Sequence, residues 1–150
     1  MAFHTERLGV SYLSRPSNRL IVEDSLIENC KAATGGGALS LGWSYDDWSA
    51  RRAPEAIFRN STISGCSADF AAAIWISAGS QPDRPVDNQV AVRLQGSSIH
   101  GSRVSTTGGI YAVDSAVVEV MDSFIYDCHS TGGSGGALSV TVNAVATVQR

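Results

Sequence analysis

The sequence predicts an all-β fold, a right-handed parallel β-helix of about four to five coils. Three observations lead to this prediction: a segment that recurs four times, apolar positions that alternate within each copy, and a spacing of only 26 residues between the last two copies. A recurring unit that cannot enclose its own apolar face must stack on its neighbours, as solenoid coils do.

The four copies align on a shared serine, which is Ser25, Ser61, Ser97 and Ser123 in turn. The copies cover residues 20–41, 56–77, 92–113 and 118–140, and the serines are 36, 36 and 26 residues apart. The shortest spacing fits one bare coil. The ten extra residues of the longer copies are therefore assigned to insertions at 42–55 and 78–90, within a single β-helix domain over 1–150.

Within each copy, apolar positions alternate with variable ones, which is typical of strands with one buried face. The apolar columns are Leu20, Ala56, Val92 and Val118; Val22, Phe58, Leu94 and Val120; and Ile27, Ile63, Ile99 and Ile125. A fourth column of small residues contains Cys30, Cys66, Ser102 and Cys128. These columns predict a shared interior that runs through all the coils.

Small residues mark the corners of the predicted coil. Asp24, Asn60, Gly96 and Asp122 precede the serines, at a place where left-handed backbone geometry lets the chain bend. A closing strand at 36–41 recurs at 71–76, 108–113 and 135–140, and its tiny leading residues suit a crowded corner. Each copy then supplies about three short strands.

The alternative with the same number of repeats is a four-bladed propeller. A propeller blade needs roughly 40 residues and four antiparallel strands. The 26-residue spacing is too short for such a blade, and this favours the β-helix.

The repeats resemble those of the pectin-lyase-like superfamily of right-handed β-helices, and in particular the GGA[ILV] repeats of polymorphic outer-membrane proteins. The matching residues are Gly36-Gly37-Ala38-Leu39 and Gly135-Gly136-Ala137-Leu138, with Gly108-Gly109-Ile110-Tyr111 as a variant. The resemblance covers about residues 20–140. It implies an extracellular or cell-surface location, and relatives of this fold that cleave polysaccharides.

Both ends of the sequence carry parts of further coils. Residues 8–13 are expected to form the closing strand of a preceding coil, and residues 144–148 the opening strand of a following one. Solenoids normally cover their end coils with a polar cap, and neither end reads as one. We therefore expect a slice of a longer solenoid, whose further coils are its neighbours.

Composition argues against several classes of partner. Lys31 stands beside ten arginines that form no block, and the net charge is -3, so a phosphate-binding surface for nucleic acid is not expected. No apolar run approaches the roughly 20 residues of a membrane span. The first seven residues contain no apolar stretch that resembles a signal peptide.

The three cysteines are interpreted as part of the interior rather than as a site. Cys30, Cys66 and Cys128 occupy one column, and free cysteines are often buried. No C-x-x-C pair is present, so no metal and no cofactor are expected. The thiols are expected to be free.

The first insertion holds the candidate ligand-binding residues. Flat aromatic rings next to carboxylates suit sugars, because sugar CH faces stack on rings while hydroxyls bond to carboxylates. The candidates are Trp43, Tyr45, Asp46, Asp47 and Trp48. The alternative, which stays open, is that the two tryptophans only pin the loop to the solenoid. The second insertion should leave the same edge, so that the two loops wall a groove.

Two hypotheses for function remain. The first is a non-catalytic structural or adhesive segment of a secreted or surface protein that contacts a polysaccharide or cell-surface glycan. The second is a fragment of a polysaccharide lyase or glycoside hydrolase acting on acidic or plant and algal polysaccharides. Catalysis by either enzyme needs carboxylates that converge on one face. The strand faces of these coils show no such set, so no catalytic residue is assigned.

Overall fold

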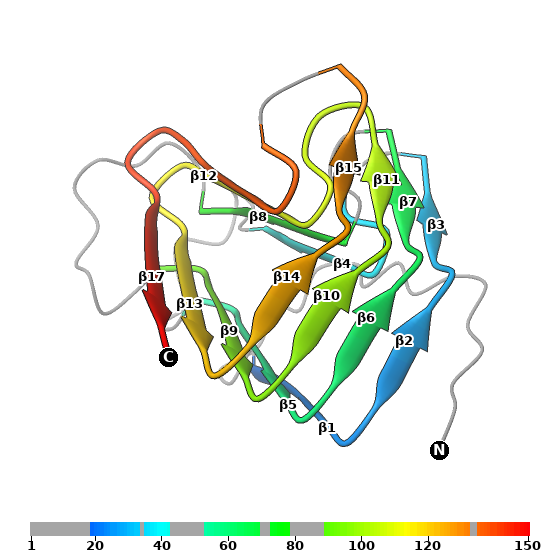
Figure 1. Cartoon of the computed structure of the whole chain (residues 1–150). Helices are drawn as coiled ribbons and strands as arrows, with labels where there is room; N and C mark the ends of the chain where they lie inside the picture. The colour runs from blue at the N-terminus through cyan, green and yellow to red at the C-terminus, as the bar shows by residue number, and fades with distance from the viewer. Residues whose placement is uncertain (1–18, 34, 43–52, 70–72, 79–88, 133–134) are drawn as a thin grey trace.

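A computed structural model of the chain describes residues 19–33, 35–42, 53–69, 73–78, 89–132 and 135–150. These residues form seventeen β-strands and no helix. The strands make four parallel sheets, in which each strand pairs with the equivalent strand of the coil before and after it (Figure 1).

The first sheet opens each coil and contains five strands of five residues each. They are β1 (Arg19–Glu23), β5 (Glu55–Arg59), β9 (Ala91–Gln95), β13 (Val117–Met121) and β17 (Val145–Gln149). We call this the opening sheet. The last strand, β17, begins a fifth coil on top of β13, which confirms that residues near 144–148 open a further coil. The strand expected at 8–13 lies outside the described residues.

The other three sheets have four strands each. The second sheet contains β2 (Leu26–Glu28), β6 (Thr62–Ser64), β10 (Ser98–His100) and β14 (Phe124–Tyr126). The third contains β3 (Lys31–Ala32), β7 (Ser67–Ala68), β11 (Arg103–Val104) and β15 (His129–Ser130). The closing sheet contains β4 (Leu39–Gly42), β8 (Ile74–Ser77), β12 (Ile110–Val113) and β16 (Leu138–Val140).

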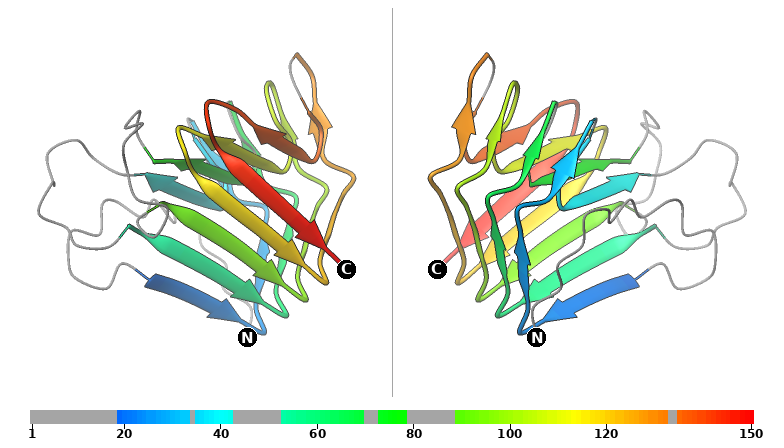
Figure 2. Two further views of the ribbon diagram at one scale, coloured as in Figure 1. Left: turned by 90° about the vertical axis from the view of Figure 1, so that its left-hand side faces the viewer. Right: turned by 90° about the vertical axis from the view of Figure 1, so that its right-hand side faces the viewer.

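The coils wind in the right-handed sense that the sequence predicts. In Figure 1 the chain runs anticlockwise from β13 through β14 and β15 to β17. Figure 2 places the C-terminal coils on the side that faces the viewer of Figure 1. An anticlockwise path that approaches the viewer is right-handed, so the fold is a right-handed parallel β-helix.

The interior consists of the predicted apolar columns. The register pairs Leu20 with Ala56 and Val22 with Phe58, and the same columns continue through the later coils. Ile63 and Ile99 pair with each other and are buried to 1% and 0% exposure. Because a parallel sheet places paired residues on the same face, each column becomes a continuous stack inside the solenoid.

Each coil has four strands rather than the three that the sequence predicts. The additional strand is the two-residue third strand, for example Lys31–Ala32. A strand of two residues has too little alternation to be read from a pattern. It turns the chain between the second and closing sheets, and its buried residues Ala68 and Val104 form a small cluster of their own.

The predicted alignment of the third closing strand is wrong by one residue. The sequence alignment places Tyr111 in the column of Leu39. In the structure Leu39 pairs with Ile74, and Ile74 pairs with Ile110, so Ile110 occupies that column. Burial decides this register: Ile110 points inward and is fully buried, and the next residue must then point outward.

The recurrence of a serine at the first corner of each coil has a hydrogen-bonding cause. The backbone N–H of Ser61 donates to Oγ of Ser97 at 3.1 Å, and the N–H of Ser97 donates to Oγ of Ser123 at 3.0 Å. Each hydroxyl in turn donates to the carbonyl two residues earlier in its own coil, as Ser61 Oγ does to Arg59 O at 2.7 Å. The serines therefore form a ladder that links successive coils at the first corner.

Left-handed residues turn the chain at two corners of every coil. The predicted set, Asp24, Asn60, Gly96 and Asp122, has φ values of 47°, 46°, 58° and 46°. A second set five residues later was not predicted: Asn29, Gly65, Gly101 and Asp127 have φ values of 54°, 61°, 65° and 49°. Asparagine, aspartate and glycine tolerate this geometry best. The recurrence of these residue types five positions after the first set was therefore a sequence signal for the second corner.

The cysteines occupy the interior column that the sequence predicts, and all three thiols are free. Cys30 and Cys66 are buried, while Cys128, in the last complete coil, is only partly covered.

Candidate functional site

The predicted ligand-binding loop lies outside the described residues. Its candidate residues are Trp43, Tyr45, Asp46, Asp47 and Trp48. What the structure describes is the place from which this loop leaves the solenoid and the place to which it returns.

Both insertions leave and rejoin the same edge of neighbouring coils. Gly42 at the end of β4 pairs with Ser77 at the end of β8, and Glu55 at the start of β5 pairs with Ala91 at the start of β9. The described ends of the two insertions are therefore stacked one above the other, as predicted. We call this corner the insertion edge.

In the later coils the same corner is a two-residue turn. Asp114 and Ser115 have φ values of 57° and 62°, and Val142 and Asn143 have values of 51° and 60°. Oγ of Ser77 donates a hydrogen bond of 2.9 Å to Oδ2 of Asp114, which ties this turn to the coil below it. The insertions thus replace a tight turn, and of their predicted ranges only Gly42 in β4 and Glu55 in β5 belong to a described sheet.

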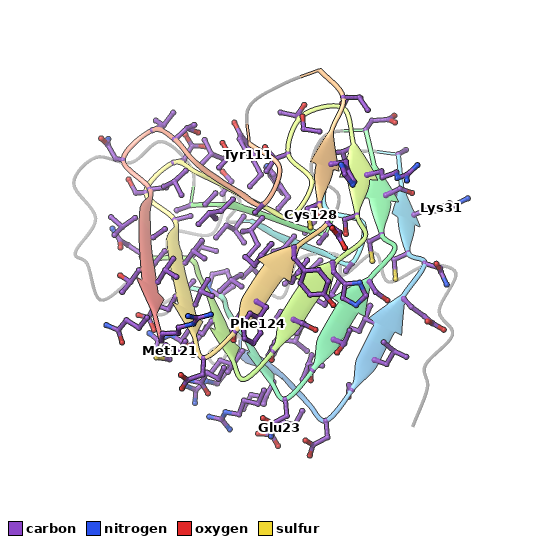
Figure 3. All side chains as sticks on the ribbon, in the orientation of Figure 1. Glu23, Lys31, Tyr111, Met121, Phe124 and Cys128 are labelled. Atoms are coloured by element: carbon purple, nitrogen blue, oxygen red, sulfur yellow. The ribbon has the colours of Figure 1, made fainter. Side chains whose placement is uncertain are left out.

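An aromatic pair that the sequence analysis did not assign lies next to the insertion edge. Trp75 on β8 and Tyr111 on β12 pair in register, between residues that point into the core. Both side chains are only partly buried, and Figure 3 shows Tyr111 on the outer side of the closing sheet. The signal for them was the alternation in Ile74-Trp75-Ile76, where the middle residue must face outward.

The ring of Trp75 reaches the start of the first insertion. A Cβ placed on Gly42 would lie 3.6 Å from Cζ3 of Trp75, which is ordinary van der Waals contact. Gly42 directly precedes Trp43 in the sequence. The aromatic row is flanked by serines, since Ser40 pairs with Trp75 and Ser139 with Tyr111. We call Ser40, Trp75, Tyr111 and Ser139 the aromatic row.

The outer face of the opening sheet is charged, and its charges alternate from coil to coil. Arg19 Nε lies 2.7 Å from Glu55 Oε2, and Arg93 Nε lies 3.0 Å from Glu55 Oε1 and 3.4 Å from Glu119 Oε2. The Nε–H of Arg93 is not aligned for a hydrogen bond in either contact, so these are charge contacts only. The result is a chain of opposite charges across four neighbouring strands.

A second charged row lies beside it. Arg59 Nη1 contacts Glu23 Oε1 at 2.7 Å, and its Nε donates to Oε1 of Gln95 at 2.9 Å. Figure 3 shows Glu23 at the outer margin of the solenoid. Glu23, Glu55 and Glu119 thus each contact an arginine of a neighbouring coil.

Within the described residues, no group of three or more His, Cys, Asp and Glu side chains is arranged to hold a metal ion. His100, on the outer face of the second sheet, is engaged with an aromatic ring: it stacks on Tyr126 with 4.8 Å between ring centroids and 15° between planes.

The environment of the cysteine column disfavours the reactive thiolate form. Burial raises the pKa of the Cys66 thiol to about 12, and the neighbouring Cys30 adds a repulsion that opposes ionisation. Burial also raises the pKa of Cys128. Because the thiolate is the nucleophile and the metal ligand, Cys66 and Cys128 remain protonated thiols near neutral pH.

Comparison of the chain with protein-family models, with curated proteins and with solved structures finds no match. None of the described elements is a helix long and apolar enough to cross a membrane.

Proposed function

We propose that this chain is a non-catalytic structural and adhesive segment of a secreted or cell-surface protein, and that it contacts glycan chains at the insertion edge. The proposal includes kinship with the pectin-lyase-like β-helices, on the strength of the repeat motifs. The observation that carries it is the aromatic row: Trp75 and Tyr111 stand side by side on the outer face of the closing sheet, against the residue from which the predicted loop departs.

The aromatic row has the properties that sugar binding requires. Aromatic side chains offer large flat apolar surfaces together with a polar group at the tip. Neighbouring strands lie about 4.8 Å apart, so the two side chains are direct neighbours along the solenoid axis. The proposal keeps Trp43, Tyr45, Asp46, Asp47 and Trp48 as candidate glycan-contacting residues.

The pairing of the described charges favours a structural over a catalytic role. Each of the three glutamates on the opening sheet contacts an arginine of a neighbouring coil. Such pairs tie coil to coil. The competing hypothesis, a fragment of a polysaccharide lyase or hydrolase, would need its catalytic carboxylates elsewhere.

Affinity electrophoresis in gels cast with polygalacturonate, alginate or xylan tests the glycan contact. We expect retardation of the wild-type protein in at least one gel, and a loss of about tenfold in affinity for Trp75→Leu, which keeps an apolar cover but removes the ring. Tyr111→Ala should act in the same direction. Phe124→Ala is the matched control, because Phe124 is an exposed aromatic on a different sheet.

Circular dichroism of each variant checks that the coils remain folded. Equal retardation of the wild type, Trp75→Leu and Tyr111→Ala in every gel would remove the aromatic row from consideration. Release of sugar fragments from any of these polysaccharides by the wild-type protein would replace the adhesive proposal with the enzymatic one.

A further inference from the structure

We propose that Asn60 is a modification site that carries an N-linked glycan. Asn60, Ser61 and Thr62 form the pattern N-x-T, in which the asparagine amide accepts a sugar chain in secreted proteins. Of the five asparagines in the sequence, only Asn60 is followed two positions later by serine or threonine. The proposal rests on the secreted location in the proposed function, and not on glycan contact at the aromatic row.

The two residues that define the motif lie on the outer side of the coil. Asn60 is exposed and joins β5 to β6, and Thr62 begins β6 as a half-buried, outward residue. Ser61 between them is 2% exposed, and its hydroxyl donates to the carbonyl of Arg59 at 2.7 Å as part of the serine ladder. The motif tolerates any residue except proline in the middle, so the buried position is the one that it leaves open.

The backbone at Asn60 is held by the next coil, whereas its side-chain amide is not engaged. The residue has a φ of 46°, and its N–H donates to Gln95 O at 3.0 Å. Within the part of the chain that the structure describes, the side-chain amide makes no hydrogen bond. The amide nitrogen Nδ2 is therefore available for substitution without the loss of a contact.

The following coil leaves room beside this amide. The residue at the equivalent corner is Gly96, and a Cβ placed there would lie only 2.8 Å from Oδ1 of Asn60. Oδ1 is thus the end of the amide that faces Gly96, and Nδ2 is more than 4 Å from that position. A sugar on Nδ2 would therefore extend away from the neighbouring corner.

The fold itself requires neither the amide of Asn60 nor the hydroxyl of Thr62. At the first corner of the other coils, the equivalent residues are Asp24, Gly96 and Asp122. The residues in the column of Thr62 are Leu26, Ser98 and Phe124. Packing therefore allows either residue to change, and it does not account for their occurrence two positions apart.

The corner that holds Asn60 lies on a different side of the coil from the aromatic row. Figure 1 shows β5 and β6 meeting at the bottom of the solenoid, whereas β8 and β12 of the closing sheet cross its upper part. The attached glycan and the proposed contact with an external glycan therefore occupy separate surfaces.

The attachment forms one bond and breaks one. Nδ2 of Asn60 attacks C1 of the first sugar of a lipid-diphosphate-linked oligosaccharide, and the bond between C1 and the diphosphate oxygen breaks. The lipid diphosphate leaves with the electron pair, and the amide nitrogen gives up one proton to the transferase. The product is an uncharged N-glycosidic bond at an exposed corner.

Expression of the full chain behind a secretion signal in cultured eukaryotic cells tests the proposal. We expect a single form of reduced gel mobility, in the medium and in the cell lysate, that digestion with peptide-N-glycosidase converts to the mobility of the unmodified chain. This enzyme converts a glycosylated asparagine to aspartate. Peptide mass spectrometry after digestion should therefore find aspartate at position 60.

Asn60→Asp should abolish the mobility shift completely. Aspartate already occupies this corner at Asp24 and Asp122, with φ values of 47° and 46°, so the substitution leaves the coil folded. Asn29→Asp is the matched control: Asn29 is also exposed and left-handed, and Asp127 holds its corner in the last coil. Because Asn29 lies outside the motif, this variant should keep the full shift.

Substitutions of Thr62 separate the motif from the fold. Thr62→Val keeps the shape of the side chain but removes its hydroxyl, and it should abolish the shift. Thr62→Ser restores a hydroxyl and should restore the shift. Circular dichroism of the purified variants checks that their strand content is unchanged.

Absence of a glycosidase-sensitive form of the wild-type chain in both medium and lysate would overturn the proposal. Persistence of the shift in Asn60→Asp or in Thr62→Val would do the same, as would its loss in Asn29→Asp. Polysaccharide retardation is measured on protein made in bacteria without this modification, so the two proposals can fail separately.

Discussion

At the scale of single residues, the repeated serine shows how one hydroxyl serves two coils. Ser97 is 4% exposed, accepts the N–H of Ser61 and donates to the carbonyls of Phe58 and Gln95 at 3.1 and 3.0 Å. Buried backbone groups without a partner are costly. A small side chain that both donates and accepts is therefore needed at this corner in every coil, and serine is the smallest that does so.

Replacing Ser97 by alanine should lower the free energy of unfolding by about 1–3 kcal/mol, because the N–H of Ser61 would lose its acceptor inside the protein. Urea unfolding followed by circular dichroism measures this difference. The control is Ser98→Ala, whose hydroxyl contacts Thr62 Oγ1 at 3.2 Å on the outer face. A cost for Ser97→Ala no larger than that of the control would contradict the role of the ladder.

At the scale of elements, the start of the closing strand is limited by backbone contact between coils. A Cβ on Gly109 would collide with the carbonyl oxygen of Ala137 and would lie 2.9 Å from Cγ2 of Ile125. A Cβ on Gly108 would lie 2.7 Å from the backbone N of His129. Glycines before the third closing strand are thus required by the approach of the next coil, which agrees with the crowded corner that the sequence predicts.

Gly109→Ala should therefore destabilise the protein by about 1–3 kcal/mol, as overpacking in a well-packed interior does. Gly132→Ala is a suitable comparison, because a Cβ there would meet only Ser105 O at 3.4 Å. We expect the comparison variant to change the free energy of unfolding by no more than about 0.5 kcal/mol. Thermal melts of both proteins that shifted by the same amount would exclude the close approach as the cause.

At the scale of the whole molecule, the solenoid tolerates loops of very different length at one corner. Ser77 and Ala91 flank the second insertion, and their partners in the next coil, Val113 and Val117, are joined by only three residues. The sheets are continuous across both kinds of connection. The scaffold and the insertion edge are therefore separable parts, with stability in the coils and recognition proposed at the edge.

A chain in which Asp-Ser-Ala replaces residues 78–90 should keep its cooperative unfolding and its strand signal in circular dichroism. The expected cost is about 1–2 kcal/mol, because alanine would replace the buried Val90 and leave a small cavity. Shortening the connection itself changes the closure entropy only slowly with length. Loss of cooperative unfolding would show instead that the insertion holds the coils together.

The candidate site was less predictable than the coils. Trp75 and Tyr111 are 36 residues apart in sequence, and they are neighbours because Ile110 rather than Tyr111 pairs with Ile74. The predicted site residues 43–48 drew attention because aromatic and acidic residues are adjacent in the sequence. A pair brought together by stacking leaves no such local signal, and only the placement of Ile110 in the core decides which side of β12 faces outward.

The sequence by itself determined the repeat and the inward columns, such as the one that contains Ile27, Ile63, Ile99 and Ile125. It also determined the corner with the serines and the opening strand of a fifth coil. This was possible because every coil repeats the same alternation of inward and outward residues. When the coils stack, the inward residues at equivalent positions form one column through the interior. The tertiary structure alone decided the fourth strand of each coil, the outward partnership of Trp75 with Tyr111 and the alternation of Arg and Glu across strands. These features depend on which residues of different coils lie side by side. Inward positions are all apolar because they are buried, whereas outward positions can carry any side chain, so their neighbours cannot be read from a pattern.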